Sequence, residues 1–138
     1  MQPSEWWQIN GTSPANFNMR GVEWEREANI ELFEPNGNLG FNHRAGVRIH
    51  GGWTRSFPQK SLRLYARGRY GANEFNYRFF PDRDDSLFKR ILLRNSGNDH
   101  DATFFRDALI HQMIQHRPIT SQDWQPSVTF VNGECCRI

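Results

Sequence analysis

The chain has 138 residues, which is the size of one domain and long enough to bury a hydrophobic core. Hydrophobic residues make up 37% and charged residues 23%, a balance typical of folded rather than disordered proteins. No apolar run approaches the about 18 residues of a membrane-spanning helix. The net charge is only +2, yet residues 44–69 hold seven Lys or Arg and no acid. This window predicts an anion-attracting surface.

Residues 1–20 are rich in Asn, Ser, Gln and Pro, and we expect an irregular lead-in there. Strand-like sequence begins near Val22, and a Pro-Asn-Gly-Asn turn at residues 35–38 follows it. Residues 45–50 and 60–67 alternate between apolar and polar side chains. The alternation predicts two strands, each with one buried face and one polar face that carries Arg48 or Arg63.

The second half of the chain contains one helical pattern. An aromatic segment at residues 75–80 and a strand at 88–94 precede a polar connector at 95–101. A helix is then expected over residues 103–116, capped by Asp101 or Thr103 and ended by Pro118. A strand at residues 127–131 runs into an Asn-Gly turn. The side chains expected to form the buried stripe of the helix are Phe105, Ala108, Leu109, Gln112 and Met113.

This order of elements predicts an α+β fold, with a mostly antiparallel sheet and one main helix packed on it. The turn at Asn132-Gly133 requires a return strand, and only five residues follow it. We therefore expect residues 21–138 to be an incomplete domain.

The residues with candidate chemistry lie mostly in the acid-free window. Lys60 shares the apolar parity of Leu62 and Leu64, so it either turns outward at the strand end or reaches into a cleft. In the second case it is a candidate phosphate contact, together with the arginines nearby. Two strands joined by a glycine-containing loop hold phosphates in several kinases. No Walker-type loop, HExxH or GxSxG pattern is present.

The polar connector leaves two readings open. Asp99-His100-Asp101 is either a metal-binding corner or a helix cap, and capping is the favoured reading. Arg106 either forms a salt bridge or contacts a ligand. The adjacent Cys135 and Cys136 have neither disulfide nor metal spacing, and we interpret them as incidental thiols.

Several blocks of the sequence resemble, in the same order, the CotH kinase family, which is named for a spore coat protein. The similarity runs from about Gly21 onward. The blocks are AGVRIHGGWTRSFPQKSLR at residues 45–63, LLRNSGND at 92–99, TFFRDA at 103–108 and FVNGE at 130–134.

The resemblance implies a distantly protein-kinase-like fold and a kinase that uses ATP and Mg²⁺. Such proteins phosphorylate Ser or Thr in partner proteins, and bacterial relatives with these stretches are often exported as large multidomain proteins. Arg48 and Lys60 match basic residues of the family's first block, and Arg106 matches an arginine after the acidic turn. The resemblance therefore implies ATP-phosphate contacts for Arg48, Lys60 and Arg106, with Arg63 as a further candidate.

The sequence departs from the family pattern at its end. The family's catalytic and metal-binding aspartates are expected beyond residue 138, so little kinase activity is expected from this chain alone. Cys135-Cys136-Arg137 stands where the family usually has Tyr-Trp-Gly, and we interpret the chain as a truncated reading of a longer gene with errors at its end. The alternative function is a non-catalytic surface or binding module of the same shape. A nucleic-acid partner is not expected, because phosphate contacts explain the basic window.

Overall fold

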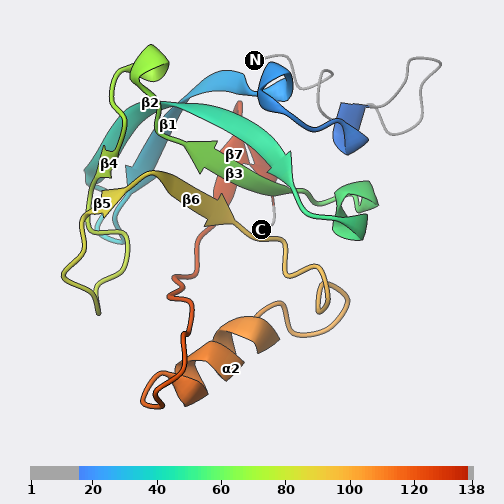
Figure 1. Cartoon of the computed structure of the whole chain (residues 1–138), viewed down its shortest axis with the longest axis vertical. Coiled ribbons are helices and arrows are strands. Elements are labelled where there is room, and N and C mark those ends of the chain that lie inside the picture. The colour runs from blue at the N-terminus through green and yellow to red at the C-terminus, as the bar shows by residue number, and fades with distance from the viewer. Residues whose placement is uncertain (1–15, 137–138) are drawn as a thin grey trace.

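The computed structural model describes residues 16–136, and its centre is a four-stranded antiparallel sheet in the order β1-β2-β3-β6 (Figure 1). Two small hairpins, β4-β5 and β7-β8, and the helix α2 complete the fold, which confirms the α+β class. The strands are β1 (Arg26–Phe33), β2 (Leu39–His50), β3 (Ser61–Tyr65), β4 (Phe75–Asn76), β5 (Leu87–Phe88), β6 (Arg90–Leu93), β7 (Thr129–Val131) and β8 (Glu134–Cys136). The helix α2 is Arg106–Ile114, and short 3-10 turns are η1 (Asn16–Asn18), η2 (Val22–Trp24), η3 (Trp53–Ser56) and η4 (Gly68–Tyr70).

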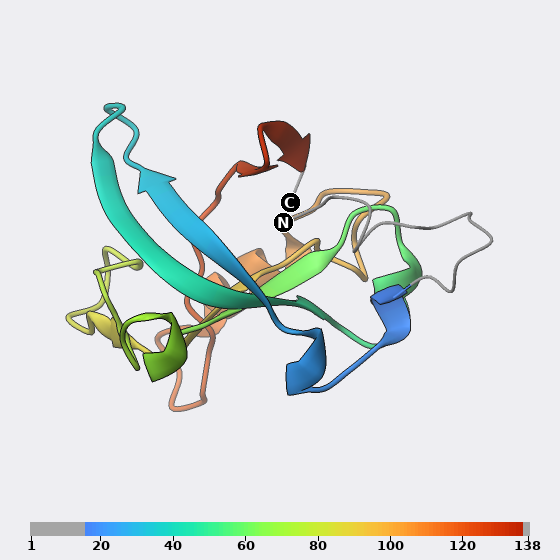
Figure 2. The ribbon, with the colours of Figure 1, turned by 90° about the horizontal axis from the view of Figure 1, so that it is seen from above.

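The β1-β2 hairpin is longer than the sequence pattern predicts. β2 begins at Leu39 rather than at residue 45, because β1 pairs with it along its whole length, from Arg26 opposite Val47 to Phe33 opposite Leu39. The predicted turn is present, and Gly37 adopts the positive φ of 85° that such a turn favours in glycine. Figure 2 shows β2 as a long, curved strand that crosses the molecule.

The core lies on one face of this sheet, as the alternation predicts. Val47, Leu62 and Leu64 are buried on this face, and Ala45 is completely buried beside them. Phe75, from the predicted aromatic segment, is 1% exposed, and its ring lies edge-on against Phe41 with centroids 5.7 Å apart. An aromatic cluster therefore closes the core where the sheet ends.

The helix is shorter than expected and does not pack on the sheet, so this part of the fold prediction is wrong. No residue of α2 is buried, and Figure 1 shows the helix standing away from the sheet. Phe105, Leu109 and Met113 of the expected buried stripe are 50%, 43% and 71% exposed. A hollow of about 1000 Å³ lies where packing was expected, lined by β6, α2 and residues 122–128.

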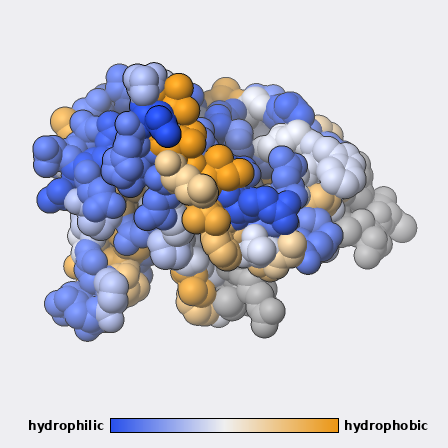
Figure 3. Space-filling model, turned by 90° about the horizontal axis from the view of Figure 1, so that it is seen from below, coloured by the Kyte–Doolittle hydropathy of each residue, from blue (hydrophilic) through white to orange (hydrophobic). Residues whose placement is uncertain are grey.

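Hydrophobic side chains remain on the surface of this second half. Trp124, Val128 and Phe130 are exposed in addition to the helix residues. Figure 3 looks onto this side and shows hydrophobic residues gathered between hydrophilic ones. The expected Asn-Gly turn is present, with φ of 52° at Asn132 and 83° at Gly133, and β8 is the return strand that it requires.

The remaining sequence expectations concern the ends of the chain. Most of the expected lead-in, residues 1–15, lies outside the described residues, as do Arg137 and the side chains of Cys135 and Cys136. Within the described part, no helix is long and apolar enough to cross a membrane.

The burial of Phe75 predicts a large loss of stability for Phe75→Ala. The substitution removes a buried ring and leaves a cavity, so the free energy of unfolding is expected to fall by about 3–5 kcal/mol. Phe33→Ala is the matched control, because Phe33 is also in a strand but is 58% exposed. Urea unfolding followed by circular dichroism measures both, and equal losses in the two variants would contradict the described core.

Candidate functional site

The antiparallel pairing of β2 with β3 sets the polar face of the sheet. Arg48 lies opposite Arg63, and Gly46 opposite Tyr65. Residues opposite each other in such a pair point to the same face, so both arginines project from one surface. The guanidinium of Arg48 lies 4.2 Å from the centroid of the Tyr65 ring, which orients it by a cation–π contact.

Arg63 and His50 form the second contact on this face. Arg63 Nη2 lies 3.1 Å from His50 Nε2. Burial lowers the pKa of His50, and the positive charges of Arg63, Arg55 and Arg94 lower it further. A neutral imidazole can accept a hydrogen bond from Arg63. Among residues 16–136, Arg63 has no carboxylate within ion-pair distance, so its charge is not compensated by an acid.

A buried carboxylate lies next to Arg48. The Glu25 side chain is 0% exposed, and three groups donate hydrogen bonds to it. Arg67 donates through Nε at 2.9 Å and Nη2 at 3.1 Å, and Tyr70 donates through its hydroxyl at 3.0 Å. Arg69 donates through Nη2 at 2.5 Å, and Arg48 Nε lies 3.5 Å from Oε2. Burial alone would raise the pKa of Glu25, but the hydrogen bonds from Arg67, Arg69 and Tyr70 outweigh it and the pKa is lowered.

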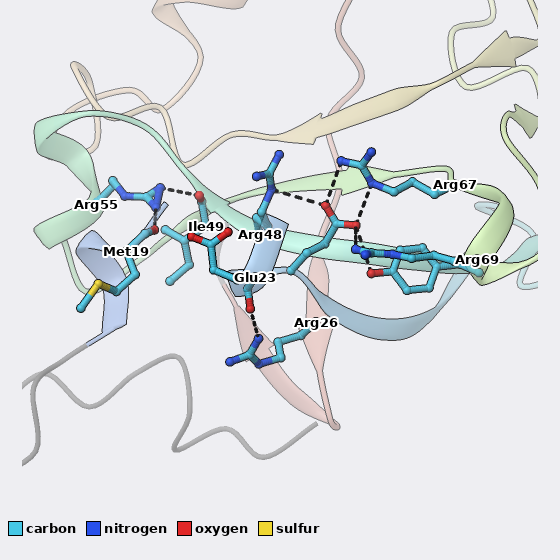
Figure 4. A network of polar contacts seen from close by, with 10 residues as sticks. Met19, Glu23, Arg26, Arg48, Ile49, Arg55, Arg67 and Arg69 are labelled. Carbon is cyan, nitrogen blue, oxygen red and sulfur yellow. Dashed lines mark hydrogen bonds and ion pairs between the residues drawn. The ribbon is translucent and has the colours of Figure 1, made fainter. Parts of the chain in front are cut away.

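Gly46 makes room for this carboxylate. A Cβ atom at Gly46 would overlap with Glu25 Oε1 and with the Tyr70 ring. The absence of a side chain on β2 therefore lets an acid from the β1 side sit directly over the strand. Figure 4 shows the result, with Arg48, Arg67 and Arg69 converging on one place above the sheet.

Lys60 lies in a different environment from these arginines. It is 2% exposed, and its ammonium donates hydrogen bonds to the carbonyl oxygens of Arg55, at 2.8 Å, and of Phe57. The Phe17 ring centroid is 4.9 Å from Nζ. Burial, and then the charge of Arg55, lowers the pKa of Lys60. The Lys60 side chain therefore neither turns outward nor reaches into a cleft. Its ammonium instead links backbone carbonyl groups within the loop between β2 and β3.

Arg55 completes this loop in the same way. It is 5% exposed, and its guanidinium donates to the carbonyl oxygens of Phe17, Ile49 and Met19. Two buried cations are therefore held by backbone oxygens, and within the described chain neither has a carboxylate partner. Because Phe17 and Met19 precede the sheet in sequence, the two side chains also fasten that segment to the loop.

Asp99 connects the polar connector to the start of α2, as the capping reading expects of this segment. Its carboxylate accepts hydrogen bonds from the backbone N–H of Thr103 at 3.4 Å and of Arg106 at 3.1 Å, and also from the Thr103 hydroxyl. These bonds, together with the Arg106 charge, outweigh the effect of burial and lower the pKa of Asp99. The N-cap position of α2 is occupied by Phe105 rather than by Asp101 or Thr103, and Asp99 accepts the N–H of the first helical residue from outside the helix. No group of three potential metal ligands occurs among the side chains that the structure describes.

Arg106 forms the salt bridge that was one of its two readings, and contact with a ligand stays a prediction. Its Nη2 lies 3.0 Å from Asp99 Oδ1, while 58% of its side chain remains exposed. It lines a shallow hollow of about 660 Å³ together with Trp53, Phe57 and His100. The His100 ring stacks on Phe57 with centroids 4.1 Å apart.

The structure thus brings together only part of the predicted set. Arg48 and Arg63 are neighbours on the polar face, whereas Lys60 is buried in the loop and Arg106 lines a hollow beside that loop. Sequence reasoning missed Glu25, Arg67, Arg69 and Tyr70. Arg67 and Arg69 lie in the acid-free window, but no local sequence signal connects them to Glu25, which precedes the β1-β2 hairpin.

The chain has two lysines, which makes the burial of Lys60 directly testable. Lys89 is exposed and serves as the matched control. Brief acetylation of the native protein, read by mass spectrometry, is expected to modify Lys89 and leave Lys60 unmodified. Lys60→Met is expected to lower the free energy of unfolding by about 1–3 kcal/mol, because two carbonyl groups lose their donor. Rapid acetylation of Lys60 in the folded chain would refute this placement.

His50 predicts a pH dependence of stability. Its pKa in the folded chain lies below the ordinary value of 6.5, so the unfolded chain takes up the proton first as the pH falls. Stability is therefore expected to fall as the pH drops below about 6.5, until the folded pKa is passed. Urea titrations between about pH 5 and 7 should show a shallower slope for His50→Gln. The exposed His116→Gln variant should keep the original slope, and a loss of slope there would argue against His50 as the source.

Comparison with known proteins covers most of the residues described above. Residues 47–136 match the model of the family described as CotH kinase protein. No curated protein and no solved structure matches the chain. The matched segment covers more than half of the sequence and includes Arg48, Lys60, Arg63 and Arg106, and it confirms the resemblance identified from the sequence blocks. The chain therefore belongs to the CotH kinase family.

Proposed function

We propose that this chain is the ATP-phosphate-binding part of an atypical protein kinase. In the full-length protein, the kinase transfers the γ-phosphoryl group of ATP to Ser or Thr side chains of partner proteins. Membership of the CotH kinase family over residues 47–136 supports the proposal. The proposal includes a distant relationship between the fold of this chain and the protein-kinase fold.

The observation that carries the proposal is the position of Arg48 opposite Arg63 on one face of the β2-β3 pair. A guanidinium presents several N–H donors in a planar fork that matches phosphate oxygens. Arg63 has no acid partner among the described residues, so a phosphate would supply the missing negative charge. The glycine-containing loop that follows Arg48 is the kind of element that lies over phosphates in kinases.

Lys60 and Arg106 have more indirect parts in this proposal. Lys60 holds the β2-β3 loop through the carbonyl groups of Arg55 and Phe57. Its ammonium can contact a phosphate only by leaving these oxygens. Arg106 keeps an exposed guanidinium but shares it with Asp99. We therefore assign the direct phosphate contacts to Arg48 and Arg63 first.

Mg²⁺ is the metal that kinases use with ATP, and it belongs to the proposal through the family. The described residues include no group of three His, Cys, Asp or Glu side chains that could hold it. No step of the reaction is therefore assigned to the metal, and we expect nucleotide binding rather than efficient phosphoryl transfer from this chain.

ATP binding tests the proposal. Isothermal titration calorimetry on the purified 138-residue chain should show saturable binding of ATP. The Arg48→Ala/Arg63→Ala variant should bind at least about tenfold more weakly, because a hydrogen bond to a charged group contributes about 1.5–3 kcal/mol. Arg44→Ala is the matched control, since Arg44 lies on the same strand and pairs with Glu27 at 2.8 Å.

Two further outcomes decide between the readings. A chain that is folded by circular dichroism but does not bind ATP, or binds it equally well without both arginines, would overturn the proposal in favour of the non-catalytic binding module. Transfer of label from γ-labelled ATP to casein should not exceed that of Lys60→Ala. Transfer above this control would mean that the chain carries its own catalytic groups.

A further inference from the structure

The surroundings of Glu25 contain more positive charge than the carboxylate requires. Arg67 alone engages both carboxylate oxygens, at 2.9 and 3.1 Å, and this two-point contact is sufficient to compensate one buried acid. Arg69 and Arg48 add two more guanidinium groups, at 2.5 and 3.5 Å. Three cations around one anion leave a surplus of two positive charges in a small volume.

The surplus charge is held in a fixed arrangement. The guanidinium groups of Arg48 and Arg67 lie 4.2 and 5.0 Å from the centroid of the same Tyr65 ring, and the Arg69 guanidinium lies 4.6 Å from that of Tyr70. Each arginine is therefore positioned by a carboxylate and by an aromatic face. Such positioning reduces the conformational entropy that a ligand must overcome when it binds several arginines together.

The cluster is also accessible. The side chains of Arg48, Arg67 and Arg69 are 22%, 39% and 48% exposed, whereas Glu25 beneath them is 0% exposed. In Figure 4 the guanidinium groups of Arg48 and Arg67 lie beside each other on the same side of the strand. Donors that do not face Glu25 are thus available to a ligand that arrives from solvent.

We propose that Arg48, Arg67 and Arg69 form an oxyanion site that binds the triphosphate chain of a nucleoside triphosphate, with Glu25 holding the three side chains in place. A triphosphate carries several negative charges along a short chain of oxygens. Two or three guanidinium groups that share one carboxylate lie close enough together to contact several of these oxygens at once. This inference rests on the proposed function and extends it, because it places the phosphates toward Arg67 and Arg69 rather than toward Lys60.

Inorganic tripolyphosphate is the probe, because it has the phosphate chain without the nucleoside. Calorimetry on the full chain should show saturable binding. Arg48→Ala and Arg69→Ala should each weaken it about tenfold, the equivalent of one charge-assisted contact of about 1.4 kcal/mol. Arg44→Ala should change the affinity by less than about twofold, because an exposed ion pair elsewhere on the strand contributes little. Unchanged affinity in Arg69→Ala would overturn the site.

Arg67→Ala uncovers a buried carboxylate and can fail to fold, so a measurement on the unmodified protein accompanies the variants. Butanedione modifies accessible arginines, and tripolyphosphate should protect Arg67 and Arg69 but not Arg44. Equal protection at all three, or at none, would contradict the site.

The two proposals fail in different ways. If ATP binding is lost in Arg63→Ala and unaffected in Arg69→Ala, the function stands and the oxyanion site is wrong. If tripolyphosphate binds as expected but ATP binds no better than the phosphate chain alone, the oxyanion site stands as a site for inorganic polyphosphate. The assignment to a nucleotide is then wrong.

Discussion

The antiparallel pairing of β2 with β3 is the interaction on which the rest of the structure depends. It places Val47 and Leu64 together in the core and, on the opposite face, sets Arg48 beside Arg63. In the same pairing Gly46 lies opposite Tyr65. Because Gly46 has no side chain, space remains above the strand for the Glu25 carboxylate. A shift of one residue in this register would move the arginines into the core, so burial of the apolar face also determines the position of the charges.

The protein buries charge in two different ways a short distance apart along the chain. Glu25 is surrounded by arginines, so its charge is more than compensated and the surplus faces solvent. Lys60 and Arg55 are instead surrounded by carbonyl oxygens, which carry partial rather than full charges. The pKa of Lys60 is lowered accordingly, by burial and by Arg55. The first arrangement presents cations to a ligand, whereas the second uses cations to hold a loop.

Much of the sheet could be predicted from the sequence, because alternation is a local property. It indicated the faces of Val47, Arg48, Leu62 and Arg63 correctly, and it also indicated that Lys60 has the parity of the core. The surroundings of Lys60 could not be predicted in the same way, since they include Phe17, a residue distant in sequence. The arginine cluster was missed for the same reason, because Glu25 reaches it only through the fold of the β1-β2 hairpin.

The helix shows a feature that sequence periodicity predicted wrongly. Phe105, Leu109 and Met113 have the spacing of one helical face, but all three are exposed, and Ile110 on another face of α2 is exposed as well. Spacing alone therefore did not specify which face, if any, would be covered. The start of the helix is secured independently, by Asp99 and its bonds to Thr103 and Arg106. Arg94 adds an ion pair with Asp107, and the backbone N–H of Gln122 donates a hydrogen bond to His111 Nδ1. The contacts described for α2 are therefore polar, and none of its residues is buried. Arg48 lies on β2, Arg67 and Arg69 lie at η4, and their common partner Glu25 immediately precedes β1. The arginine cluster is therefore held by elements other than α2, and its charge does not depend on the packing of the helix.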